Sequence, residues 1–270
     1  MKRLTFAIVL LAGVAGCHHA PPNVRFAPPG TDTARLRSEF ALTDAERLAL
    51  TPDSIRRLTQ EQIDQLYKRL SSGPVPDGPF RGDLFFPKDA NGDATIGDVA
   101  APVPPLLRDV SAMKLRHIGR AFWKGKVFFR PQMILRNRIE DLAILKPIIG
   151  NTDGIQKLTF DGRTTWLLFP AKVSCGESRL DTSQRSVVID YAKGNEVEGY
   201  REVPDKLAGP EGLNIRDEIR AIRRGLYLGR AYFGERFALN FTLVDPTVPA
   251  AGSISPELKQ DCAAFAGGGR

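Results

Sequence analysis

Eight polar side chains in the second half of the chain could carry acid–base chemistry. They are Glu177, Ser178, Asp190, Tyr191, Arg216, Asp217, Glu218 and Tyr227. Asp190 and Glu218 would form an acid/base pair if both faced one cavity. A set of Ser178, His117 and Asp190 can also be written, but Ser178 lacks the Gly-x-Ser-x-Gly elbow that exposes such a nucleophile. We favour the alternative that these acids and arginines pair across neighbouring strands at the mouth of a barrel.

The sequence lacks the motifs for phosphate, dinucleotide and zinc binding, and we expect neither a cofactor nor a metal. His18-His19 has no further ligands nearby. Asp89 to Ile96 is similar to the start of a calcium loop, with oxygen donors at its first, third and fifth positions. Ala94 then replaces the turn glycine and Ala100 replaces the bidentate acid, so we expect a polar loop without calcium.

The charge of the chain is mildly positive, at a formal +7 over 270 residues. The basic residues are scattered among acidic ones, which predicts a mixed, solvated surface; a positive balance also suits lipid headgroups. No basic run has aromatic residues interleaved, so nucleic acid is not an expected partner. With 42% hydrophobic residues, the chain can bury a sizeable core.

The N-terminus has the layout of a secretory signal. A basic Met1-Lys2-Arg3 precedes an apolar run, Leu4 to Val14, that is too short to span a bilayer. The run ends in Val14-Ala15-Gly16-Cys17, which resembles the lipobox of bacterial lipoproteins at all four positions. The resemblance implies removal of residues 1–16 and acylation of Cys17, with two or more chains as a stable membrane anchor. His18, in place of aspartate, implies an outer-membrane location facing the periplasm or the cell surface.

Four further segments follow the signal. Residues 17–40 are polar and proline-rich, which predicts a flexible tether. Residues 41–73 are expected to be helical, with capping boxes beginning at Thr43 and Thr59. Residues 80–245 are rich in short β-prone runs, and residues 246–270 read as a loose tail.

The β-prone runs predict antiparallel pairing. Asp161-Gly162 between two such runs is a strong hairpin signal. Leu226 to Phe233 and the run after Arg236 form a second hairpin, in which Phe237, Leu239, Phe241 and Leu243 alternate onto one buried face. The run from Ile215 to Arg223 fits both a helix and a strand. About eight strands after a helical segment predict a mainly β fold, an antiparallel barrel or sandwich.

With Cys17 assigned to lipid by the lipobox resemblance, Cys175 and Cys262 remain. In an exported protein an even pair predicts a disulfide, here joining the C-terminal tail to the loop before Ser186. A reactive thiol at Cys175 is the alternative, although His117 is the only histidine in the body of the chain.

Several phrases between about residues 120 and 245 resemble an uncharacterised bacterial protein family. They are Trp123-Lys124-Gly125-Lys126-Val127-Phe128 with Asn137, Gly176-Glu177-Ser178 with Asp181, Val187-Val188-Ile189-Asp190-Tyr191, Arg216-Asp217-Glu218-Ile219-Arg220, and Gly225-Leu226-Tyr227-Leu228-Gly229. The resemblance implies a lipocalin-like antiparallel β-barrel and no particular activity. Cys175, Leu180 and Arg224 depart from the pattern of the family.

Three functions fit these observations. The first is a lipid-anchored barrel that binds an apolar or amphiphilic molecule, since small barrels can hold one ligand. Its candidate lining is aromatic: Trp123, Phe129, Trp166, Tyr191, Tyr227 and Phe241. The second is an envelope hydrolase or lipid-modifying enzyme that uses acidic, serine and tyrosine residues at the barrel mouth. The third is a structural envelope protein with a solidly packed barrel. The first is our expectation, with no enzymatic activity.

Overall fold

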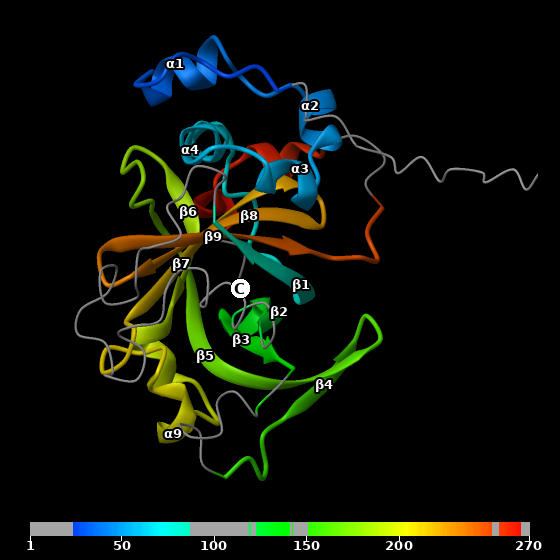
Figure 1. Ribbon diagram of the computed structural model, residues 1–270, viewed down its shortest axis with the longest axis vertical. Helices are drawn as coiled ribbons and strands as arrows, with labels where there is room; N and C mark the ends of the chain where they lie inside the picture. The colour runs from blue at the N-terminus through cyan, green and yellow to red at the C-terminus, as the bar shows by residue number, and fades with distance from the viewer. Residues whose placement is uncertain are drawn as a thin grey trace, which may run out of the picture.

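The computed structural model describes residues 24–86, 119, 123–140, 142, 151–249 and 254–265. Within them, eight antiparallel strands close into a barrel, because the sheet order β3-β2-β1-β9-β8-β7-β6-β5 is completed by pairing of β3 with β5 (Figure 1). The strands are β1 (Gly78–Phe85), β2 (Trp123–Phe129), β3 (Ile134–Ile139), β5 (Arg163–Glu177), β6 (Arg185–Asp190), β7 (Ile215–Arg223), β8 (Leu226–Phe233) and β9 (Arg236–Val244). The predicted barrel is therefore confirmed. Cys17, the loop Asp89 to Ile96 and His117 lie outside the described residues.

Both predicted hairpins are present. Strand β4 (Lys157–Phe160) pairs with β5 through Asp161-Gly162, whose φ angles of 54° and 68° are the positive values that a type I′ turn requires. Strands β8 and β9 are joined by the short turn at Gly234. The ambiguous run from Ile215 to Arg223 is strand β7, with Ile219 in the barrel core.

A bulge changes the predicted alternation of β9. The register between β8 and β9 shifts between Ala231 and Tyr232. Across this shift the side chains of β9 no longer alternate strictly between the inner and the outer face of the barrel. Leu239, Phe241 and Leu243 point into the core, as expected. Phe237 does not: it packs against Tyr232, and the Arg230 guanidinium lies 4.2 Å from the centre of its ring. The expectation that Phe237 shares their face is wrong.

Four short helices precede the barrel (Figure 1). They are α1 (Thr33–Ser38), α2 (Asp44–Ala49), α3 (Pro52–Arg56) and α4 (Gln60–Arg69), with capping boxes at Thr43, Thr51 and Thr59. Helices α2, α3 and α4 lie over the outer side of β7 and β8, and α1 packs on α4. Ile63 and Leu66 of α4 pack with Ile222 of β7 and Leu226 and Leu228 of β8 in a second apolar core. None of the described helices is both long and apolar enough to cross a bilayer.

The segment that precedes α2 is attached to the body. Val24, Ala27 and Leu36 are buried, and the Gln65 side chain hydrogen-bonds both the N–H and the carbonyl of Ala27. The Arg69 guanidinium donates to the carbonyls of Arg25 and Phe40. Residues 24–40 were expected to belong to the flexible tether, but burial of their apolar side chains holds them on α4.

Residues 254–265, which follow β9, are anchored to the body, where a loose tail was expected. Cys262 forms a disulfide with Cys175 of β5, with their Cα atoms 5.6 Å apart. The helical turn η4 (Pro256–Lys259) carries the buried Leu258, and η5 (Cys262–Phe265) begins at the buried Cys262. The remaining short elements are η1 (Arg130–Gln132) between β2 and β3, and η3 (Tyr191–Glu196) and α9 (Glu202–Asp205) between β6 and β7.

Candidate functional site

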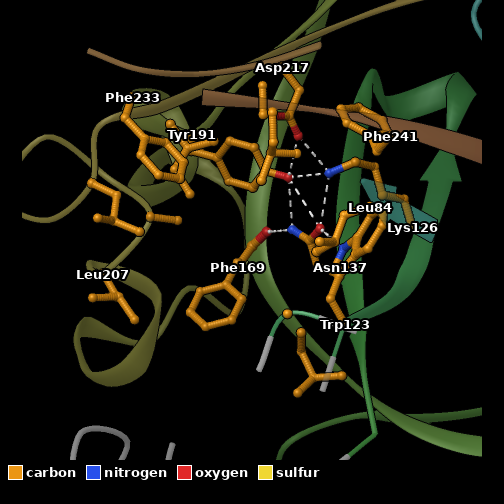
Figure 2. A pocket seen from close by; sticks show the side chains of 17 residues that line it. Leu84, Trp123, Lys126, Asn137, Phe169, Tyr191, Leu207, Asp217, Phe233 and Phe241 are labelled. Carbon is orange, nitrogen blue, oxygen red and sulfur yellow. Dashed lines mark hydrogen bonds and ion pairs between the residues drawn. The ribbon is translucent and has the colours of Figure 1, made fainter. Parts of the chain in front are cut away.

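The barrel interior is packed at one end and hollow at the other. At the packed end, the ring of Phe80 makes edge-to-face contacts with Phe128 and Tyr227. At the other end lies a cavity of about 160 Å³ (Figure 2). Apolar side chains from seven strands and from the β6–β7 connection line most of it: Leu84, Trp123, Ile139, Phe169, Leu207, Ala208, Leu213, Ile215, Ala231, Phe233, Leu239 and Phe241.

One wall of the cavity is a connected polar network. Lys126 Nζ donates to Asp217 Oδ2 at 2.7 Å, to Asn137 Oδ1 at 3.0 Å and to the Tyr191 hydroxyl at 2.5 Å. Asn137 Nδ2 donates to the Tyr191 hydroxyl at 2.9 Å, and Trp123 Nε1 donates to Asn137 Oδ1 at 2.9 Å. Figure 2 shows these polar groups converging from strands β2, β3 and β7 and from η3. They form a pre-organised polar patch on an otherwise apolar cavity.

Lys126 faces inward because of a bulge at Gly125. The β2–β3 register shifts between Trp123 and Gly125. Gly125 has φ +123°, and a Cβ there would come 2.1 Å from the carbonyl oxygen of Phe80, so only glycine fits. The shift places the side chains of Trp123 and Lys126 on the same, inner face.

Burial sets the protonation of the network. Lys126 is almost fully buried; burial lowers its pKa, and the charge and hydrogen bond of Asp217 raise it. Burial raises the pKa of Tyr191 well above its usual value, and the Asp217 carboxylate raises it further. The phenol is therefore neutral. Lys126 Nζ and Asp217 Oδ2, 2.7 Å apart, form a buried ion pair. The Lys126 ammonium also lies 5.2–5.4 Å from the ring centres of Trp123, Tyr191 and Phe241, where their π-electrons favour a cation.

Phe169 is held in a strained conformation beside this network. Its φ is 51°, in the left-handed region that bulky residues rarely adopt. Its N–H donates to Asp205 Oδ1 at 2.7 Å, and its carbonyl accepts from Asn137 Nδ2 at 3.0 Å. Strain of this kind persists only where surrounding contacts fix it, and it concentrates at functional sites. Here it turns the Phe169 side chain toward the cavity.

Three of the six predicted aromatic lining residues are at the cavity. Trp123, Tyr191 and Phe241 line it. Phe129 does not line it. The prediction assumed strict alternation along β2, and the bulge at Gly125 reverses which of the later side chains face inward. Tyr227 belongs to the packed end, against Phe80. Trp166 lies beside the core, partly buried, under the ammonium of Lys157.

The sequence prediction missed Lys126 and Asn137 as site residues. Both belong to phrases that carry the family resemblance, as do Trp123, Tyr191 and Asp217. Three of the five phrases, far apart in the chain, contribute side chains to one network. Only the three-dimensional arrangement shows that the side chains of these separate phrases meet.

The predicted acid/base pair does not share the cavity. Asp217 points inward, so its neighbour Glu218 points outward, where it accepts hydrogen bonds from the Arg179 N–H and the Arg216 guanidinium. Asp190 caps η3 by accepting from the Ala192 N–H. Glu177 and Ser178 also lie outside the lining. Glu218 pairs with Arg216 of its own strand and Asp190 caps η3, so neither makes the ion pair across strands that we expected. Of the eight polar residues, Tyr191 and Asp217 line the cavity.

A second, polar cavity of about 360 Å³ lies on the other side of Trp123 and Leu84, which line both. Its basic residues are mostly engaged in ion pairs, such as Arg81 with Asp161 and Arg56 with Asp83. Arg138 is buried there and donates to the carbonyls of Phe80, Lys124 and Phe160. This cavity is a solvated groove braced by hydrogen bonds. Among the described residues, no cluster of three or more His, Cys, Asp or Glu is placed to hold a metal.

No protein-family model matches the sequence, and no curated protein shows significant similarity to it. Among solved structures, a protein from Thermomonospora curvata is similar, with 17% sequence identity and a TM-score of 0.40. The alignment covers 74% of this chain and 95% of that one.

Proposed function

We propose that this protein is an acylated protein of the bacterial envelope whose barrel binds an apolar or amphiphilic small molecule. The observation that supports the proposal best is the hollow, aromatic-lined end of an otherwise packed barrel. A dry cavity of about 150 Å³ in another protein admits benzene, so a cavity of this size suits a small ring or a short chain. The Lys126–Asp217 network supplies the few convergent polar groups that are typical of ligand sites.

The two other functions have less support. A solidly packed barrel would have no such cavity. No serine, cysteine or histidine is found among the described residues that line the cavity, and its Lys126, Asp217 and Tyr191 side chains are hydrogen-bonded to one another. The acids at the predicted barrel mouth are occupied in capping and ion pairs.

Filling the cavity should abolish binding of an apolar probe. Ala231→Phe places a ring inside the cavity from β8, and Ala208→Phe does so from the β6–β7 connection. We expect each variant to lose at least about tenfold in affinity for toluene, measured by calorimetric titration, which corresponds to about 1.4 kcal/mol.

The matched control is Ala264→Phe, at an exposed position of η5, which should bind as the unchanged protein does. Thermal unfolding of all variants checks that each is folded. Equal toluene affinity in the folded cavity variants and the control would contradict the proposal, as would an unchanged protein that binds neither toluene nor p-cresol.

The membrane anchor is tested at Cys17. We expect Cys17→Ser to move the protein from the membrane fraction to the soluble fraction, because a single acyl chain or none does not give stable anchoring. Cell fractionation with immunoblotting measures this. His18→Asp is the matched variant: it keeps the lipobox and should remain in a membrane fraction. A Cys17→Ser protein that stays with the membrane refutes acylation at this residue.

A further inference from the structure

We infer that the ligand presents a neutral hydrogen-bond donor, such as a hydroxyl group, to Oδ1 of Asp217, and that the cavity discriminates against carboxylates. This inference rests on the proposed binding function and names the class of ligand. It follows from an account of which hydrogen-bonding groups at the cavity are already used.

The ammonium of Lys126 has no donor left for a ligand. An ammonium carries three N–H groups. Those of Lys126 go to Asp217, Asn137 and Tyr191. An anionic head group would have to displace one of them, and its charge would oppose Asp217. The cation is therefore already neutralised, although it is the feature that would first suggest an anion site.

Asn137 and Tyr191 are also saturated. Both N–H groups of the Asn137 amide are used, on the Phe169 carbonyl and the Tyr191 hydroxyl. The Asn137 Oδ1 accepts from Lys126 and from Trp123 Nε1. The Tyr191 hydroxyl accepts from Lys126 and Asn137, and donates to Asp217 or to Asn137 Oδ1, both 3.2 Å away. None of these groups offers a free donor to the cavity.

Asp217 retains an unused acceptor. Its Oδ2 atom receives the hydrogen bonds from Lys126 and Tyr191. Its Oδ1 atom accepts no hydrogen bond in the described part of the chain, although the side chain is only 6% exposed and lines the cavity. A carboxylate oxygen in an apolar cavity needs a donor. A ligand O–H or N–H supplies one, while a second ammonium would be repelled by Lys126.

The cavity size allows a matched set of small aromatic probes. Toluene tests the apolar cavity alone, p-cresol adds one hydroxyl donor, 4-methylanisole blocks that donor with a methyl group, and 4-methylbenzoate carries the opposing charge. We expect p-cresol to bind at least tenfold tighter than 4-methylanisole and 4-methylbenzoate, and tighter than toluene, in calorimetric titrations at pH 7. Sites built around a buried polar group reject analogues that leave it unpaired.

The outcomes separate the inference from the proposed function. If toluene binds but p-cresol gains nothing over 4-methylanisole, or if 4-methylbenzoate binds tightest, the inference is overturned while the binding barrel stands. If none of the four probes binds, both fail. Asp217→Asn provides a second test where it folds: the ratio of p-cresol affinity to 4-methylanisole affinity should fall toward one. The comparison of probes on the unchanged protein does not depend on that variant.

Discussion

Asp217→Asn is expected to cost the folded protein about 3–5 kcal/mol of stability, because it leaves the Lys126 ammonium buried without its counter-charge. The substitution preserves the size of the side chain, so the loss reflects charge rather than packing. Urea unfolding followed by fluorescence gives the change in the free energy of unfolding. A matched control is Glu235→Gln, which breaks an exposed ion pair with Arg179 and should cost no more than about 1 kcal/mol.

The deficit of Asp217→Asn should shrink as the pH rises toward the pKa of an unfolded lysine. Burial lowers the pKa of Lys126, and Asp217 is the group that opposes this. Without Asp217 the folded pKa falls further, so the unfolded state binds more protons and stability rises with pH up to about 10.4. Combining the substitution with Lys126→Met should recover part of the loss. A loss of stability below about 1 kcal/mol, or a loss that does not change with pH, would show that Lys126 and Asp217 do not form a buried ion pair.

The parts of the fold that were predictable are those whose signals are local. The Asp161-Gly162 turn needs two residues with positive φ, and the Thr43 and Thr59 caps need a hydroxyl three residues before an acid or amide. Each of these rests on neighbours in the chain. The alternation of Leu239, Phe241 and Leu243 is equally local and places β9 correctly.

The site was only partly predictable because a single inserted residue changes which side chains face inward. Strict alternation from Trp123 places Lys126 outside and Phe129 inside. The bulge at Gly125 reverses this, and the Phe80 carbonyl of β1 lies so close that only glycine fits there, a contact between strands far apart in the sequence. In the same way, Asp217 and Glu218 are adjacent acids, and their side chains point to opposite faces of β7. Which of them reaches the cavity depends on which face of β7 is turned inward.

The disulfide has a comparable expected effect on stability, through a different route. Cys175 and Cys262 are 87 residues apart, so their bond removes much of the freedom of the unfolded chain. The chain-entropy account gives about 4.6 kcal/mol for a loop of this length, before any strain in the native state. We expect Cys262→Ser to lose about 2–4 kcal/mol in urea unfolding without reductant, and Cys175→Ser to lose the same.

The double variant Cys175→Ser with Cys262→Ser should be no less stable than either single one, because each alone already breaks the bond. Ser72→Ala is a useful reference: it removes only the hydrogen bond from the Cys262 N–H, at 2.7 Å, and should cost about 1 kcal/mol. The C-terminal segment keeps other contacts without the disulfide, such as the Gly73 N–H to the Gln260 carbonyl and Arg47 to the Leu258 carbonyl. Ready labelling of both cysteines by a thiol reagent in the denatured, unreduced protein, or additive losses in the double variant, would instead support the reading of Cys175 as a free thiol.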